Sequence, residues 1–149
     1  MIGERELSAL DRAAREAAGR AYCPYSKFPV GAAVLTADGQ VHSGCNVENA
    51  SYGLTICAER NAVFQAVARA SGPLRIKAVL VYTPTASPTA PCGACRQVLN
   101  EFGPDAEVIC LCDGPDVIRT TLRELLPRAF GPHTLVVGSS DTLPGRGSD

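Results

Sequence analysis

A stretch with one helix between two buried strands decides the fold. Residues 76–112 read IKAVLVYTPTASPTAPCGACRQVLNEFGPDAEVICLC. The apolar runs at 76–82 and 107–112 are short and continuous, which is typical of strands buried in a sheet. Residues 92–102 between them are predicted to form a helix that stops at Gly103-Pro104. Buried strands separated by helices predict an α/β domain in which helices cover the sheet.

The N-terminal side adds a hairpin and two helices. Asp38-Gly39 lies between two apolar runs, which indicates an antiparallel hairpin. The predicted elements are an amphipathic helix over 7–21 that Pro24 ends, strands over 30–36 and 41–45, and a helix over 57–70 that Gly72-Pro73 ends.

The C-terminal side adds a strand and a short helix. A strand is predicted over 117–120, and Thr121-Leu122-Arg123-Glu124 fits a capping box that opens a helix ended by Pro127. We expect residues 1–137 to form a single domain, because no repeat or linker divides them. Residues 138–149 are rich in Gly, Ser and Asp, and we expect them to be a flexible tail.

Composition excludes several function classes. The chain has 149 residues, 46% hydrophobic and 19% charged, and a single core of this size buries roughly 70% of the unfolded surface without disulfides. The net charge is -1 and neither sign forms a block, which argues against a nucleic-acid partner. No apolar run approaches the ~20 residues of a membrane span. The N-terminus carries both signs of charge and no apolar stretch, so we expect a cytosolic protein without a secretory signal.

Seven cysteines are many for a cytosolic chain of this length, and their odd number does not indicate a disulfide scaffold. Cys92 and Cys95 are three apart at a predicted helix start, where both can bind one ion. Cys57, at the start of another helix, is the obvious third ligand. Three protein ligands leave a fourth position for water, as in a catalytic zinc site. The other cysteines are expected to be small core residues: Cys23, Cys45, Cys110 and Cys112.

The neighbours of these cysteines suggest the chemistry. Helix N-termini lower thiol pKa values, but three thiolates weaken zinc as a Lewis acid unless positive charge offsets them. Arg60 or Arg96 is positioned to supply it. Glu59 is two residues beyond Cys57, roughly 200° around a helix, so it is poorly placed to bind the same ion. It is expected instead to shuttle protons beside the metal.

Other interpretations of these motifs remain open. A lone Cys-x-x-Cys also occurs in redox and structural zinc sites, although a redox site is disfavoured because Pro91 precedes the pair rather than lying within it. A lone Cys-x-Glu is almost uninformative, whereas both motifs at helix starts are more specific. Phe28 and Phe130 would ordinarily be core residues, and Arg60 a solvated helix residue.

From about Leu7 to Pro132 the chain resembles the cytidine deaminases, specifically the small homotetrameric type. The matching stretches are Ala21-Tyr22-Cys23-Pro24-Tyr25-Ser26, Phe28-Pro29-Val30-Gly31-Ala32-Ala33, Gly44-Cys45-Asn46-Val47-Glu48-Asn49-Ala50-Ser51-Tyr52, Cys57-Ala58-Glu59-Arg60, Pro91-Cys92-Gly93-Ala94-Cys95-Arg96-Gln97, Leu125-Leu126-Pro127 and Phe130-Gly131-Pro132.

The resemblance implies a three-layer αβα fold, with a mixed sheet of about five strands and helices on both faces. It implies a hydrolase that converts cytidine and 2′-deoxycytidine to uridine and 2′-deoxyuridine with release of ammonia, in pyrimidine salvage. One zinc ion per chain would be held by Cys57, Cys92 and Cys95. Zinc-activated water would attack C4 of the base, and Glu59 would carry its proton to N3 and assist departure of ammonia.

The same resemblance assigns the substrate contacts. Asn46 and Glu48, two apart in an extended segment, would bind the ribose 3′-hydroxyl. Phe28 would pack on the pyrimidine, and backbone groups around Ala58 would read the base edge. The last assignments are Arg60 with Gln97 as hydrogen-bond partners of the thiolates, and Phe130 as a contact to the pocket of a neighbouring subunit in the homotetramer.

Two rival classes share some of these motifs. A blasticidin-type or nucleic-acid-editing deaminase should lack the pair Asn46 and Glu48, and an editing enzyme should carry a basic strip. A non-catalytic zinc-stabilised binding module would not need Glu59.

Overall fold

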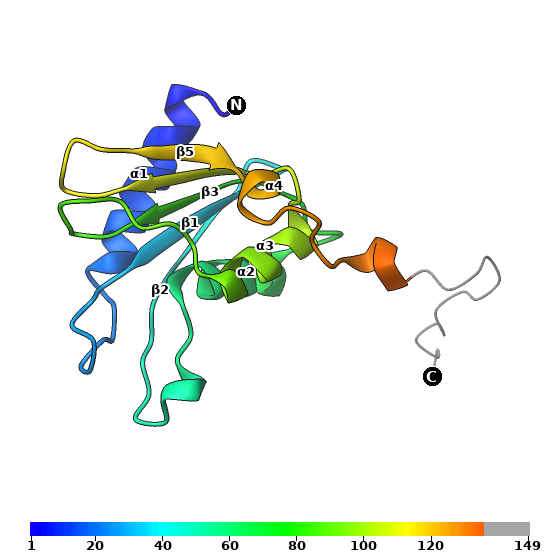
Figure 1. Ribbon diagram of the computed structural model, residues 1–149. Coiled ribbons are helices and arrows are strands. Elements are labelled where there is room, and N and C mark those ends of the chain that lie inside the picture. The colour runs from blue at the N-terminus through cyan, green and yellow to red at the C-terminus, as the bar shows by residue number, and fades with distance from the viewer. Residues whose placement is uncertain (136–149) are drawn as a thin grey trace.

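The computed structural model describes residues 1–135 (Figure 1). The predicted tail at 138–149 lies outside this range, so the domain boundary at 137 stays a prediction. The elements are α1 (Glu4–Ala18), β1 (Gly31–Thr36), β2 (Val41–Cys45), the 3-10 turn η1 (Tyr52–Leu54), α2 (Ala58–Arg69), β3 (Ile76–Tyr82), α3 (Gly93–Phe102), β4 (Glu107–Leu111), β5 (Ile118–Thr121), α4 (Leu122–Leu125) and the 3-10 turn η2 (Pro132–Leu135).

The five strands form one mixed sheet in the order β2-β1-β3-β4-β5. β3 and β4 are parallel because α3 carries the chain back between them, whereas the other neighbouring pairs are antiparallel. β1 and β2 form the expected hairpin, and Gly39 has a φ of 86°, a left-handed conformation that glycine adopts without strain. The predicted mixed sheet is confirmed.

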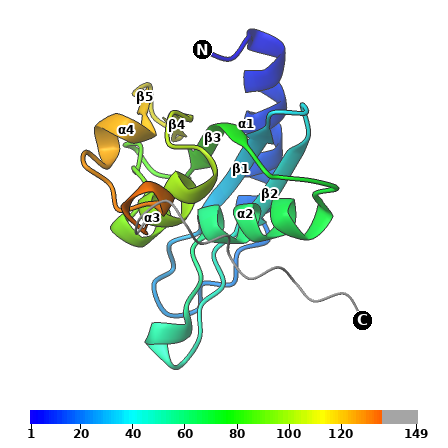
Figure 2. The ribbon, with the colours of Figure 1, turned by 90° about the vertical axis from the view of Figure 1, so that its right-hand side faces the viewer.

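Helices cover both faces of the sheet, as the three-layer prediction requires. Figures 1 and 2 show α1 against one face and α2 with α3 against the other. Along β1, Ala33 and Leu35 pack in the cluster with α1, while Ala32 and Val34 pack in the cluster with α2. All six residues of β1 are buried. Alternate side chains enter two different cores, which explains why the strand sequence is apolar throughout.

The predicted boundary of the first helix was wrong. α1 ends at Ala18, with Gly19 as its C-cap, well before Pro24. Tyr22 instead pairs with the extended segment around Val47: its N–H donates to the Asn46 carbonyl at 3.0 Å, and its carbonyl accepts from the Glu48 N–H at 2.8 Å. The helix therefore ends at Ala18, and the chain already pairs with the segment around Val47 before it reaches Pro24.

The capping box that opens α4 is confirmed, because the Thr121 side chain accepts from the Glu124 N–H. The prediction for the remaining cysteines is half right. Cys110 and Cys112 are buried, but Cys23 and Cys45 are only partly buried. Among residues 1–135, no helix is both long enough and apolar enough to cross a membrane.

The segments that carry the predicted site lie at one end of the strands. β1 begins there at Gly31, which is paired with Cys45 at the end of β2 and with Tyr82 at the end of β3. The loops before β1 and after β2 both project beyond this end of the sheet (Figure 1). α2 and α3 begin where the loops from β2 and β3 end. Residues remote in sequence are thereby brought to one place.

Candidate active site

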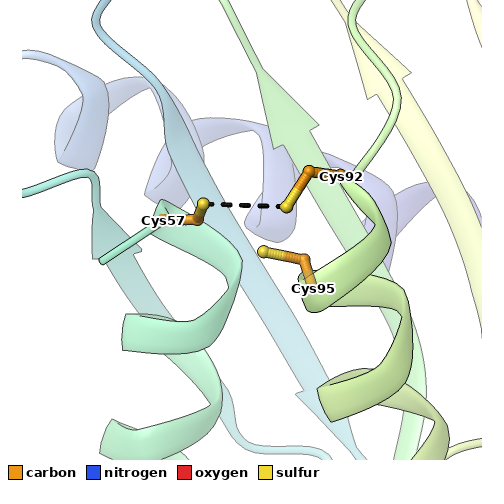
Figure 3. A group of neighbouring side chains, drawn as sticks. All are labelled: Cys57, Cys92 and Cys95. Carbon is orange, nitrogen blue, oxygen red and sulfur yellow. Dashed lines mark hydrogen bonds between the residues drawn. The ribbon is translucent and has the colours of Figure 1, made fainter. Parts of the chain in front are cut away.

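Three cysteines meet where α2 and α3 begin. Cys57 is the N-cap of α2, Cys92 is the N-cap of α3, and Cys95 lies in the first turn of α3. Their Sγ atoms all lie within 4.8 Å of one another, and those of Cys57 and Cys92 are 3.8 Å apart (Figure 3). The two helix N-termini therefore present three sulfur ligands to one point.

This cluster fits a zinc ion. With Zn–S bonds of about 2.3 Å, two ligands of a tetrahedral site have sulfurs about 3.8 Å apart, which is the spacing found between Cys57 and Cys92. Cys95 is buried, Cys57 is partly buried and Cys92 is exposed, so the cluster is open to solvent on one side. Three sulfur ligands with an open side match a catalytic rather than a structural zinc site.

Arg60 supplies positive charge to the cluster. Its Nη2 donates to Cys57 Sγ at 3.3 Å and lies 3.5 Å from the Thr55 carbonyl oxygen. Hydrogen bonding with Cys95, and next with Arg60, lowers the pKa of Cys57 to about 5 against the opposing effect of burial. Hydrogen bonding with Cys57, followed by burial, raises the pKa of Cys95, so the two thiols titrate as a coupled pair.

Arg96, the other candidate for charge compensation, makes no hydrogen bond to a cysteine sulfur among residues 1–135. Its Nε donates to the Pro91 carbonyl at 2.7 Å, and its Nη1 donates to the Leu125 carbonyl at 3.0 Å. Of the two candidates for charge compensation, only Arg60 is in contact with a zinc-ligand sulfur.

Glu59 lies in the first turn of α2, beside the cysteines. Its side chain is buried, and burial raises its pKa, with the negative charge of Cys57 acting in the same direction. Hydrogen bonding with Cys95 opposes the rise in pKa. A raised pKa makes a carboxyl group more ready to take up a proton, as a general acid and base must.

Asn46 and Glu48 face the same loop, as their spacing predicts. Asn46 Nδ2 donates to the Phe28 carbonyl at 2.9 Å, and its Oδ1 accepts from the Val30 N–H at 2.8 Å. Glu48 accepts from the N–H of Tyr25 at 2.8 Å. The two side chains thus shape the loop that presents Phe28, a role that sequence reasoning missed because these bonds span 16 to 23 positions of the chain.

A cleft of about 310 Å³ borders Glu48. Its remaining lining residues are Tyr25, Ser26, Tyr52 and Thr55. The rings of Tyr25 and Tyr52 have centroids 5.7 Å apart. Sequence reasoning gave neither tyrosine a role, although both lie within the motifs that carry the resemblance.

The aromatic candidates are at the surface. Phe28 is 37% exposed and follows Lys27, whose φ of 56° is left-handed, while Phe130 is 56% exposed. Neither is a core residue. Ala58, in contrast, is fully buried as the first residue of α2.

The Gln97 side chain bonds the Phe130 segment instead of a cysteine sulfur, which is the partner that the resemblance implies. Its Nε2 donates to the Phe130 carbonyl at 2.9 Å, and Asn100 Nδ2 donates to the same oxygen at 3.3 Å. Gln97 lies two positions after Cys95, roughly 200° around α3, so its side chain leaves on the side away from that ligand. In this structure, Gln97 therefore holds the Phe130 segment rather than a zinc ligand.

Comparisons with known proteins agree with this geometry. Residues 4–112 match the family model described as "Cytidine and deoxycytidylate deaminase zinc-binding region". A cytidine deaminase of Sporosarcina psychrophila is 47% identical over 131 residues, which cover 87% of this chain and 93% of that protein. A cytidine deaminase of Mycobacterium tuberculosis is 48% identical over 118 residues, covering 79% and 84% of the two chains.

A crystal structure shows the same fold. The cytidine deaminase from Burkholderia pseudomallei is 50% identical and superposes with a TM-score of 0.78, covering 87% of this chain and all of that one. Sequence, fold and the three-cysteine cluster therefore lead to one conclusion: the chain belongs to the cytidine and deoxycytidylate deaminase family of zinc-binding proteins.

Proposed function

We propose that this protein is a hydrolase that converts cytidine and 2′-deoxycytidine to uridine and 2′-deoxyuridine, with release of ammonia. The observation that carries the proposal is the cluster of Cys57, Cys92 and Cys95 with a buried Glu59 beside it. A structural zinc site would need the cysteines but not the carboxyl group. The membership of the family and the open side of the cluster support the same reaction.

Each residue of the cluster has a part in the reaction. Cys57, Cys92 and Cys95 hold one Zn²⁺ per chain, which when bound supplies Lewis acidity at the open position. Arg60 stabilises the Cys57 thiolate and offsets its negative charge. With that charge offset, the three thiolates weaken the Lewis acidity of a bound zinc ion less. The N-termini of α2 and α3 add their partial positive charge.

Glu59 carries the protons. It accepts a proton from the attacking water and delivers it to N3 of the base, while the water oxygen forms a bond to C4. Glu59 then transfers the second proton of the water, from the new C4 hydroxyl group, to the amino group. The C4–N bond breaks, and ammonia leaves as the C4 carbonyl forms. Water and cytidine are thereby converted to uridine and ammonia. The buried position of Glu59 supports this role, because burial raises the pKa of its carboxyl group and so favours uptake of a proton.

The loop after β2 provides the ribose site. Glu48 accepts hydrogen bonds from Tyr25 and Ser26, but a carboxylate has about four acceptor positions, so capacity remains for the ribose 3′-hydroxyl. Asn46 likewise keeps a second N–H. Phe28, presented by the loop that these two side chains hold, packs on the pyrimidine, and backbone groups around Ala58 read the base edge.

The active unit is a homotetramer in which Phe130 completes the pocket of a neighbouring subunit. Support comes from apolar side chains that are exposed in the single chain, both around the site and on the outer side of α2. These are Tyr25, Phe28, Tyr52, Leu54, Phe64, Val67 and Phe130. Burying them between subunits would remove a large apolar area from water.

The enzyme acts in the cytosol, in pyrimidine salvage, on free nucleosides rather than nucleic acid. Three reduced thiols are needed as ligands, and a reducing compartment keeps them available. The near-neutral charge of the chain supports a small-molecule substrate.

Turnover of a nucleoside tests the proposal. The purified zinc-loaded protein is incubated with cytidine, and the product is identified as uridine by chromatography while ammonia is measured in parallel. Equal amounts of uridine and ammonia are expected. Glu59→Gln loaded with zinc serves as the control, and an absence of uridine with the wild-type protein would contradict the proposed reaction.

A further inference from the structure

We propose that Arg96 is a positioning residue that fixes the orientation of Cys92 toward the metal. The inference rests on the zinc site of the proposed function. It concerns the direction in which a ligand points, whereas Arg60 acts on the charge of a ligand.

The peptide group that precedes Cys92 is held by the side chain of Arg96. Its side-chain Nε donates to the carbonyl of Pro91, whose peptide bond precedes Cys92, at 2.7 Å. The peptide group that follows Cys92 is held by the first backbone bond of α3, in which the N–H of residue 96 donates to the Cys92 carbonyl at 3.0 Å. Together the two peptide planes define φ and ψ of Cys92, here -66° and 166°. Fixing them fixes the direction of the Cα–Cβ bond and therefore limits where the sulfur lies.

Cys92 needs this support more than its partner ligands. It is exposed, so little packing restrains its side chain, and as the N-cap of α3 it has no side-chain capping bond. Cys95 is buried inside the helix, and Cys57 is contacted by Arg60. The most exposed ligand is thus the one whose preceding peptide group is held by an arginine side chain.

The guanidinium is itself anchored to the core. Nη1 donates to the carbonyl of Leu125 at 3.0 Å, 29 positions further along the chain. Leu125 is the last residue of α4, where carbonyls lack helical partners, and its side chain packs against the core cluster under α2 and α3. Arg96 therefore connects the Cys92 turn to a fixed part of the domain. A lysine at this position keeps the charge but lacks the rigid planar fork that bonds two separate carbonyls.

Zinc release measures this role without relying on turnover. Wild-type protein, Arg96→Lys and Arg123→Lys are loaded with zinc, and transfer of the metal to a coloured chelator is followed well below their melting temperatures. Because residues that orient metal ligands are worth about 10–100-fold in affinity, we expect Arg96→Lys to release zinc about 10–100-fold faster. Arg123 bonds exposed Asp105 beside α4, so Arg123→Lys is the control and is expected to release zinc at the wild-type rate.

Two further readouts separate positioning from charge or general stability. Cobalt-substituted Arg96→Lys is expected to show altered visible absorption bands, because these report the coordination geometry. Arg96→Gln is measured alongside, since it keeps the proposal testable if the lysine variant does not fold, and it too is expected to release zinc faster. If Arg96→Lys releases zinc at the wild-type rate, the proposal is overturned, whatever the release rate of Arg96→Gln. Release of zinc from Arg96→Gln at the wild-type rate would also overturn it. A wild-type protein that holds zinc but fails to deaminate cytidine would refute the proposed function and leave this inference standing.

Discussion

The Sγ atoms of Cys57 and Cys92 lie 3.8 Å apart, although the two residues are 35 positions apart in the chain and begin different helices. A metal bound between them links α2 to α3 across the strand β3 that separates them in sequence. The site therefore exists only in the folded chain, and its composition can be tested ligand by ligand.

Zinc content is the first prediction. Elemental analysis of freshly purified protein is expected to find about one zinc per chain, because three thiolates with an open position suit this metal. Cys57→Ala removes one ligand and should lower the zinc content, whereas Cys45→Ala, a partly buried cysteine outside the cluster, should not. Iron, or no metal in active enzyme, would contradict the assignment.

Glu59→Gln is expected to keep the fold and the zinc and to lose nearly all turnover. General acid–base catalysis contributes about 10²–10⁴-fold, and a group that serves two proton transfers should lie at or above the top of that range. The measurements are kcat, zinc content and the circular dichroism spectrum of the same preparation. Retention of more than a tenth of the wild-type activity would remove Glu59 from this role.

Phe130→Ala is expected to raise KM for cytidine, although Phe130 is remote in sequence from the cysteines. The side chain is 56% exposed in the single chain, where it is available to a neighbouring subunit. Val117→Ala, equally exposed at 56%, is the matched control and should leave KM unchanged. Sedimentation velocity should show that activity follows the tetramer, and a fully active monomer would refute the assembly.

The substrate is expected to be a free nucleoside. The pKa of Glu48 is lowered, chiefly by hydrogen bonding from Ser26, so the side chain stays ionised at neutral pH. In an oligonucleotide the 3′-oxygen carries a phosphate, whose charge would be repelled by this carboxylate. A site built to bond a hydroxyl rejects an analogue without it by about 10⁴-fold, so bare cytosine should also fail.

Rates with cytidine, cytosine and a short cytosine-containing oligonucleotide test this specificity. Glu48→Gln should raise KM for cytidine while zinc content stays unchanged, because it weakens binding rather than the metal site. Deamination of the oligonucleotide at a rate comparable to that of free cytidine would overturn both the role of Glu48 and the nucleoside specificity.

Acid should weaken the fold through Glu107, which lies at the opposite end of the sheet from the site. Burial raises the pKa of this carboxyl, but bonds from Arg119 and from the Ile2 N–H outweigh burial and leave the pKa below its ordinary value of 4.5. A lowered pKa in the folded state gives stability that is present above pH 4.5 and is lost as the pH falls through the folded-state pKa.

The test compares the wild-type protein with Glu107→Gln in urea unfolding at several pH values. At neutral pH the variant should be less stable by roughly 1–3 kcal/mol, because the buried amide would bond Arg119 and the Ile2 N–H less strongly than the carboxylate does. The difference should shrink as the pH falls below the ordinary carboxyl pKa. A difference that stays constant with pH would contradict the assignment.

The Arg96 and Gln97 side chains show where sequence reasoning stopped. They are the two residues after Cys95, and the sequence predicts Arg96 as a possible source of positive charge and Gln97 as a partner of the thiolates, yet they bond the carbonyls of Leu125 and Phe130. Their partners lie 29 and 33 positions away, and no local pattern encodes which carbonyl a long polar side chain will reach. The predicted end of α1 was also wrong: the helix ends at Ala18, and Tyr22 pairs with Val47, 25 positions further along the chain, which no local pattern encodes.

By itself the sequence determined the elements and the ligand types. Apolar periodicity and the Asp38-Gly39 turn specify the strands and helices, because local sterics and burial act over a few residues. The two cysteine motifs at helix starts predict a catalytic zinc site on the same local grounds. The tertiary structure alone decided which distant groups meet. It set the Cys57–Cys92 spacing, the choice of Arg60 over Arg96 as the partner of a thiolate, and the use of Asn46 and Glu48 to hold the Phe28 loop. These contacts depend on how α2 and α3 pack on the sheet, which is set by the core as a whole and not by any single segment.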